Sequence, residues 1–186
     1  MTVMAEPLCL LIYGNEEAGR LMQLMAPFTL LWYLQGPFAA VLQGLDRAKE
    51  AMRNSIFGAL VKAALIFILG SQPALGIDGV VIALNTGIVV VTVLHMATIT
   101  RLVSFTFDVR EIAKILLAML ITGWVAYLGM TTWFTSYGIG WAVPLCLLLS
   151  GVIYLFCVVL LRLLVQDDVV QIPYVGKYLA PLFPKH

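Results

Sequence analysis

The chain has 186 residues, of which 62% are hydrophobic and only 11% are charged. Because a soluble domain carries roughly 25% charged residues, this composition excludes a water-soluble globular protein. The net charge of +1 is uninformative about nucleic acid, but the lack of a long basic run argues against nucleic acid as a partner. Cys9, Cys146 and Cys157 form no CxxC motif or Cys/His cluster, so we predict no metal site, no cofactor and no disulfide framework.

The N-terminal segment differs from a signal peptide. No basic residues precede its apolar run, and Glu6 and Pro7 interrupt that run. We expect residues 1–20 to form the end of a truncated helix followed by an external loop.

Long charge-free stretches then predict an all-α, polytopic transmembrane helix bundle. A spanning helix needs about 20 mostly apolar residues, and the stretch Ile115–Leu161 is long enough for two, divided at Met130–Gly138. We predict a bundle over residues 21–165 with spans at 21–45, 52–70, 79–100, 113–130 and 139–163. The polar, proline-containing tail at 166–186 is expected to be cytoplasmic or interfacial.

The basic residues alternate between the predicted loops. Three lie in or at the edge of the loop between the first and second spans, three likewise for the third and fourth, and three from the end of the fifth span onward: Arg47, Lys49, Arg53, Arg101, Arg110, Lys114, Arg162, Lys177 and Lys185. Arg20 alone precedes the first span. Because basic loops stay in the cytoplasm, we expect a multi-pass protein of the cell membrane, in contact with the lipid bilayer, with a cytoplasmic C-terminus.

Lys62 lies near the middle of the second predicted span, where a charge is expensive. Asn54 and Gly58 precede it by eight and four residues, so the three share one side of a helix. This pattern is typical of the wall of a polar cavity, in which the lysine attracts an anionic group such as a pyrophosphate. The alternative is that Lys62 snorkels to the interface or pairs with a carboxylate.

Other polar residues are candidates for the same cavity. Gln35 and Gln43 flank Pro37 in the first span, where prolines are expected to bend or break the helix. Their amides suit either sugar hydroxyls or the carbonyls that proline frees. Asn85 and Thr92 share a face of the third span with Asp78, and for these two hydrogen bonding between helices is the favoured alternative. For His95, near the end of that span, we favour a structural role.

No catalytic residues are predicted. The acidic residues lie almost wholly in loops, and the chain contains no HExxH or GxSxG motif. We therefore do not expect an enzyme.

Several stretches together resemble a known transporter family: Leu11–Ala18, Leu42–Ala48, Arg53–Asn54, Val61–Lys62, Pro73–Gly79, Ile82–Ala83 and Ile172–Gly176. Their order and spacing resemble the stage V sporulation protein B family, in the polysaccharide-transporter branch of the multidrug/oligosaccharidyl-lipid/polysaccharide exporter superfamily. The resemblance implies a 14-helix flippase of two lobes, of which these five spans are the C-terminal part. It also implies that the N-terminal lobe lies outside this chain or in a partner chain.

The function that the resemblance implies is a flippase for undecaprenyl-pyrophosphate-linked sugars, such as a cell-wall, peptidoglycan or spore-cortex precursor, acting by alternating access. One alternative is an ion-coupled multidrug exporter of the same superfamily, which needs an acidic residue deep in a helix. Asp78, at the edge of its span, is the acid nearest to that requirement. The other alternative is a non-transporting membrane subunit or a gene fragment.

Overall fold

The computed structural model describes residues 2–104 and 108–163, and these contain helices but no strand. The helices are α1 (Ala5–Tyr13), α2 (Glu16–Gly44), α3 (Ala48–Gly70), α4 (Gly76–Leu102), α5 (Val109–Leu128), the π-helix η1 (Gly129–Trp133), the 3-10 helix η2 (Thr135–Tyr137) and α6 (Ile139–Leu160). They fall into two compact units, Met1–Thr106 and Phe107–His186. The predicted tail at 166–186 lies outside the described residues.

Five of these helices are long and apolar enough to cross a membrane: α2, α3, α4, α5 together with η1, and α6. The prediction of an all-α membrane bundle with five spans is therefore confirmed, and the chain is a multi-pass membrane protein. The helices extend past the predicted spans at several ends. Helix α2 begins at Glu16 because Asn15 caps it, accepting hydrogen bonds from the backbone N–H groups of Glu17 (2.9 Å) and Ala18 (3.2 Å).

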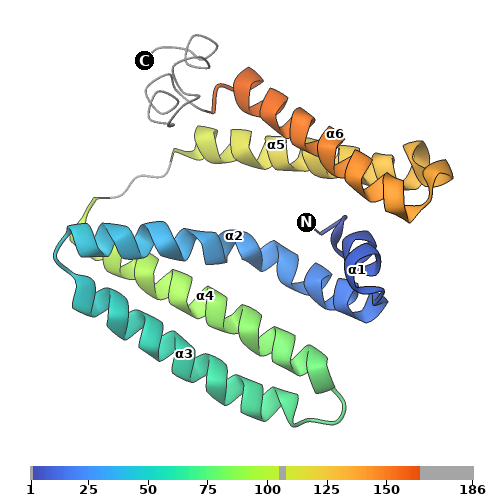
Figure 1. The fold of residues 1–186 in the computed structure, drawn as a ribbon. Coiled ribbons are helices and arrows are strands. Elements are labelled where there is room, and N and C mark those ends of the chain that lie inside the picture. Colours follow the sequence, from blue (N-terminus) through green and yellow to red (C-terminus); the bar gives the residue numbers. More distant parts are fainter. Residues whose placement is uncertain (1, 105–107, 164–186) are drawn as a thin grey trace. The chain divides into compact units, whose positions relative to one another are not determined.

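In the first unit α4 lies between α2 and α3, as Figure 1 shows. Helix α4 packs against both neighbours along its length, whereas α2 and α3 touch each other much less. At one end the three helices meet in a small core, where Leu42, Ala51 and Ile99 are buried together with Phe38 packed against them. The most buried span is thus α4, and it positions the other two.

Helix α2 is continuous despite Pro27 and Pro37, and Figure 1 draws it as one ribbon. Each proline lacks the N–H that would bond to the carbonyl four residues earlier, but its fixed φ is compatible with a helix. The structure therefore shows no break of α2 at either proline.

Helix α1 packs on the start of α2 through a tight turn. Gly14 ends α1 in the left-handed region (φ 63°) and donates its N–H to the Leu10 carbonyl at 3.0 Å. In α2, Gly19 lies so close to α1 that an added Cβ would come within 2.6 Å of the Glu6 Cα. Only two residues, Gly14 and Asn15, connect the two helices.

In the second unit α5 runs through the π-turn η1 and the short helix η2 into α6. The Cys146 thiol of α6 donates to the Ala126 carbonyl of α5 at 3.3 Å. Near this contact, an added Cβ at Gly129 would lie 2.8 Å from the Cys146 Sγ. The two spans therefore pack closely where the π-turn widens the end of α5. Trp133, Tyr137 and Trp141 have exposed side chains at this end.

Candidate functional site

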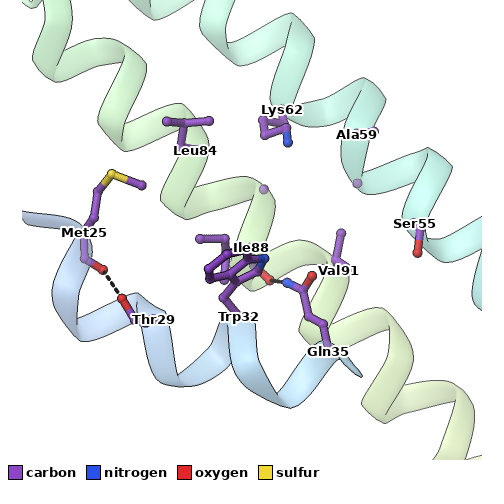
Figure 2. Close-up of a pocket in the computed structure, with 12 residues that line it drawn as sticks. Met25, Thr29, Trp32, Gln35, Ser55, Ala59, Lys62, Leu84, Ile88 and Val91 are labelled. Carbon is purple, nitrogen blue, oxygen red and sulfur yellow. Dashed lines mark hydrogen bonds between the residues drawn. The ribbon is translucent and has the colours of Figure 1, made fainter. Parts of the chain in front are cut away.

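A cavity of about 440 Å³ opens in the first unit between α2 and α3, with α4 as its floor. Figure 2 shows side chains from the three helices around it. The lining residues are Met25, Thr29, Trp32, Gln35, Ser55, Gly58, Ala59, Lys62, Leu84, Gly87, Ile88 and Val91. They come from the middle of each span, so the cavity lies within the predicted membrane-spanning part.

Lys62 lies on the α3 wall of this cavity, and its aliphatic stem crosses the surface of α4 at Gly87. An added Cβ at Gly87 would stand 2.8 Å from the Lys62 Cβ and 3.1 Å from its Cγ and Cδ. Among residues 2–104 and 108–163, no carboxylate lies within ion-pair distance of the Lys62 ammonium. This half-buried cation therefore faces the cavity without a described counter-charge.

The other polar side chains of the cavity hydrogen bond to helix carbonyls. The Gln35 amide nitrogen of α2 donates to the Ile88 carbonyl of α4 at 3.0 Å and to the Thr92 hydroxyl at 3.2 Å. The Thr29 hydroxyl donates to the Met25 carbonyl at 3.4 Å, and the Ser55 hydroxyl donates to the Ala51 carbonyl at 3.0 Å. Each of these side chains thus donates a hydrogen bond to another group of the protein.

The structure brings only two of the five predicted site residues together in this cavity, Gln35 and Lys62. Asn54 is buried on the predicted face with Gly58, and its amide donates to the Leu94 carbonyl (3.2 Å) and the Thr98 hydroxyl (3.0 Å) of α4. Gln43 is exposed in the last turn of α2 and does not line the cavity.

Asn85 and Thr92 lie on the α4 face that meets α2. The Asn85 amide donates to the Leu24 carbonyl at 3.2 Å. The Thr92 hydroxyl oxygen lies 3.1 Å from the Leu31 carbonyl of α2 and 2.8 Å from the Ile88 carbonyl of its own helix, and its hydrogen is shared between these two acceptors. His95 is also buried, and its Nδ1 lies 3.0 Å from the Val91 carbonyl of its own helix. For Asn85 and Thr92 the structure therefore supplies the hydrogen bonds between helices that the sequence favoured.

Asn85 also lines a second cavity, of about 570 Å³, on the α2–α4 seam. At its edge the Arg20 guanidinium forms a two-pronged ion pair with Asp78, at 2.8 Å and 3.1 Å. Arg20 is the fifth residue of α2 and Asp78 lies in the first turn of α4, so the pair joins the starts of α2 and α4. Within the described chain no three His, Cys, Asp or Glu side chains are close enough together to hold a metal ion.

Sequence reasoning missed Thr29, Trp32 and Ser55 as lining residues. Their spacing carried a usable signal, since Thr29 and Trp32 precede Gln35 by six and three residues, while Ser55 precedes Lys62 by seven. Such spacings place side chains on one helix face. Hydropathy alone could not show that these two faces look toward each other.

Comparison with known proteins identifies relatives. The chain is 38% identical over 177 residues to stage V sporulation protein B of Bacillus subtilis (strain 168), a match that covers 94% of this chain and 34% of that protein. It is 33% identical over 97 residues to sporulation protein YkvU of the same organism, covering 52% of this chain and 22% of that protein. No protein-family model and no solved structure matches the chain.

The chain thus spans about a third of the length of the first relative. The similarity includes nearly all of the chain, and the five candidate spans are those of a membrane protein. On these grounds the chain belongs to the stage V sporulation protein B-like family.

Proposed function

We propose that this chain forms part of a flippase that moves a lipid-linked saccharide across the cell membrane during sporulation. The observation that carries the proposal is the cavity between α2 and α3, which presents the Lys62 ammonium with no described carboxylate beside it. Two relatives whose names place them in sporulation support the biological setting.

Lys62 raises the free energy of inserting α3 into the membrane. Placing a lysine at the centre of a spanning helix costs about 2.5–3.5 kcal/mol on insertion scales, so such residues mark substrate or ion pathways. An ammonium in a cavity attracts phosphate as a point charge. An undecaprenyl-pyrophosphate-linked sugar supplies that charge, together with a head group that must be shielded from lipid during transfer.

The proposed mechanism is alternating access, in which two lobes rock about a polar cavity and the lipid tail stays in the membrane. The five spans would supply part of one lobe, and the rest of the flippase would come from a further segment or a partner chain. The basic residues Arg47, Lys49, Arg101 and Arg110 lie in or next to the α2–α3 and α4–α5 connections, and they support a cytoplasmic side for these connections and for the C-terminus in this scheme.

An ion-coupled exporter has less support. Asp78, the acid considered for coupling, is bound to Arg20 in the first turn of α4 and does not lie deep in the helix. We therefore keep the saccharide flippase as the single proposal.

The test is translocation of a fluorescent undecaprenyl-pyrophosphate-linked sugar in vesicles that contain the protein. Lys62→Ala should slow translocation about tenfold or more, because a hydrogen bond to a charged group contributes about 1.5–3 kcal/mol. Lys62→Arg should retain part of the rate.

Lys49→Ala is the matched control, since this exposed lysine lies in the first turn of the same helix and outside the cavity. The control should translocate at the normal rate. Normal translocation by Lys62→Ala at equal protein levels would remove Lys62 from the site. A complete protein, with both lobes present, that translocates no lipid-linked sugar at all would refute the proposed function.

A further inference from the structure

The polar groups of the α2–α3 cavity offer mainly acceptors to a ligand. The hydroxyls of Thr29 and Ser55 have donated their hydrogens to carbonyls of their own helices. A hydroxyl that donates still has lone pairs that can accept. Both oxygens therefore remain able to receive a hydrogen bond from a ligand, but not to give one without breaking an existing contact.

Gln35 also offers the cavity an acceptor, and its hydrogen-bond partner fixes the orientation of its amide group. The Ile88 carbonyl can only accept, so the group facing it at 3.0 Å must be the amide nitrogen of Gln35. The carbonyl oxygen of the same side chain, Oε1, consequently points away from Ile88, as Figure 2 shows. It adds a third acceptor to the cavity.

Trp32 supplies an apolar surface beside these acceptors. It lies one helical turn before Gln35, lines the cavity and leaves 58% of its surface exposed. Aromatic rings together with a few polar groups are the usual composition of small-molecule sites, whose volumes run from about 300 to 1,000 Å³. The open indole offers a flat face against which a ring with C–H groups can stack.

We infer that this cavity binds the saccharide end of the lipid carrier. A sugar ring stacks on Trp32, and the hydroxyl or amide N–H groups of the sugar donate hydrogen bonds to Gln35, Thr29 and Ser55. The phosphate of the carrier binds Lys62. The inference rests on the proposed function and names the part of the substrate that this site binds. A sugar carries many donors on its rim and apolar C–H groups on its faces, which matches the acceptors and the indole together.

Two other occupants fit less well. An acyl chain would leave the Lys62 ammonium and the acceptor oxygens without partners, and unpartnered buried polar groups are unfavourable. An inorganic phosphate would satisfy Lys62 but would bring its own oxygens against the lone pairs of Thr29, Gln35 and Ser55. Only a ligand with one anionic group and several donors satisfies both parts of the cavity.

Equilibrium binding to the purified protein in detergent tests this inference with three probes: undecaprenyl phosphate, undecaprenyl pyrophosphate, and undecaprenyl pyrophosphate carrying one N-acetylglucosamine. The sugar-bearing probe should bind at least tenfold more tightly than undecaprenyl pyrophosphate. Trp32→Ala and Thr29→Val should weaken the sugar-bearing probe and leave the two sugarless probes unchanged, whereas Lys62→Ala should weaken all three.

Matched controls are Trp124→Ala, an exposed tryptophan of α5, and Thr86→Val, whose hydroxyl also donates to its own helix but lies outside this cavity. Both should keep the preference for the sugar. Trp32→Phe keeps an aromatic ring and should keep most of the preference, which guards against misfolding of the alanine variant.

Equal affinity for sugar-bearing and sugarless pyrophosphate would overturn the inference, as would an equal loss for all probes in Trp32→Ala and Thr29→Val. If sugar-selective binding is found but no translocation occurs, the proposed function fails while the inference holds. If translocation depends on Lys62 but the sugar has no effect on binding, the flippase proposal holds and this inference fails.

Discussion

The two sides of α4 are held to their neighbours in different ways. Toward α3 the helices approach closely at glycines, since Gly58 lies against the Val91 side chain and Gly87 lies against the Lys62 stem. In the described chain, hydrogen bonds between these two helices come from one side chain, Asn54. Toward α2 the contacts are hydrogen bonds from Asn85, Thr92 and Gln35 to main-chain carbonyls of the opposite helix. Membrane helices associate by both means, small residues and polar contacts, because lipid removes the hydrophobic driving force between them.

The difference explains where the cavity forms. The close approach of α3 and α4 at Gly58 and Gly87, here called the glycine seam, packs the two helices tightly together. It holds the Lys62 stem on the surface of α4. The hydrogen-bonded seam holds α2 at discrete points, and α2 and α3 scarcely touch each other. A space lined by both therefore opens over α4.

The largest effect is expected from filling the glycine seam. Gly87→Ala should destabilise the fold by about 1–3 kcal/mol, the usual range for overpacking, because the new Cβ would stand 2.8 Å from the Lys62 Cβ, which cannot turn away. The measurement is the thermal unfolding midpoint in detergent. Gly151→Ala in α6, where an added Cβ meets nothing within 4 Å, is the control and should unfold at or above the normal midpoint. Equal midpoints for the two variants would contradict close packing at this seam.

A smaller effect is expected from the hydrogen-bonded seam. Thr92→Val keeps the size of the side chain but removes the donor to the Leu31 carbonyl and the acceptor for Gln35. Hydrogen bonds between membrane helices contribute about 0.6 kcal/mol on average and up to about 1.7 kcal/mol, so the free energy of unfolding should fall by about 1 kcal/mol. Thr100→Val, exposed and bonded only within its own helix, is the matched control. A loss larger than that of Gly87→Ala would reverse the ranking of the two seams.

The smallest effect is expected at the end of the α2–α4 seam, where Arg20 and Asp78 pair with exposed side chains. Asp78→Asn should lower the unfolding midpoint less than Thr92→Val, and the difference from the unmodified protein should shrink as salt is raised, because exposed pairs are screened. Exchanging the two residues, Arg20→Asp with Asp78→Arg, should restore most of the lost stability. A large, salt-independent loss would show that this pair holds the seam.

Hydropathy was sufficient to predict the five spans, but it located apolar segments and not helix ends. Helix α2 starts at Glu16 because Asn15 caps it and acidic residues suit the positive end of a helix, which are local effects that an apolar window does not contain. The helical spacing of Asn54, Gly58 and Lys62 correctly predicted one shared face, now seen against α4.

What could not be predicted was the order of packing. Nothing in the spacing of Asn85 or Gln35 says which neighbour each will meet, because that depends on α4 lying between α2 and α3. For this reason the five candidate residues could be placed on faces but not assembled into one cavity, and Trp32 could not be distinguished from an ordinary lipid-facing aromatic residue.

A ribosome delivers α2 and α3 to the membrane before α4 exists. At about 5–20 residues per second, both helices wait for seconds with lipid against the faces that α4 later covers. They have little contact with each other, so neither can hold the other in register during this interval. Arrival of α4 supplies most of the contacts that join the three helices, and an insertion defect confined to α4 would leave α2 and α3 inserted with few contacts between them.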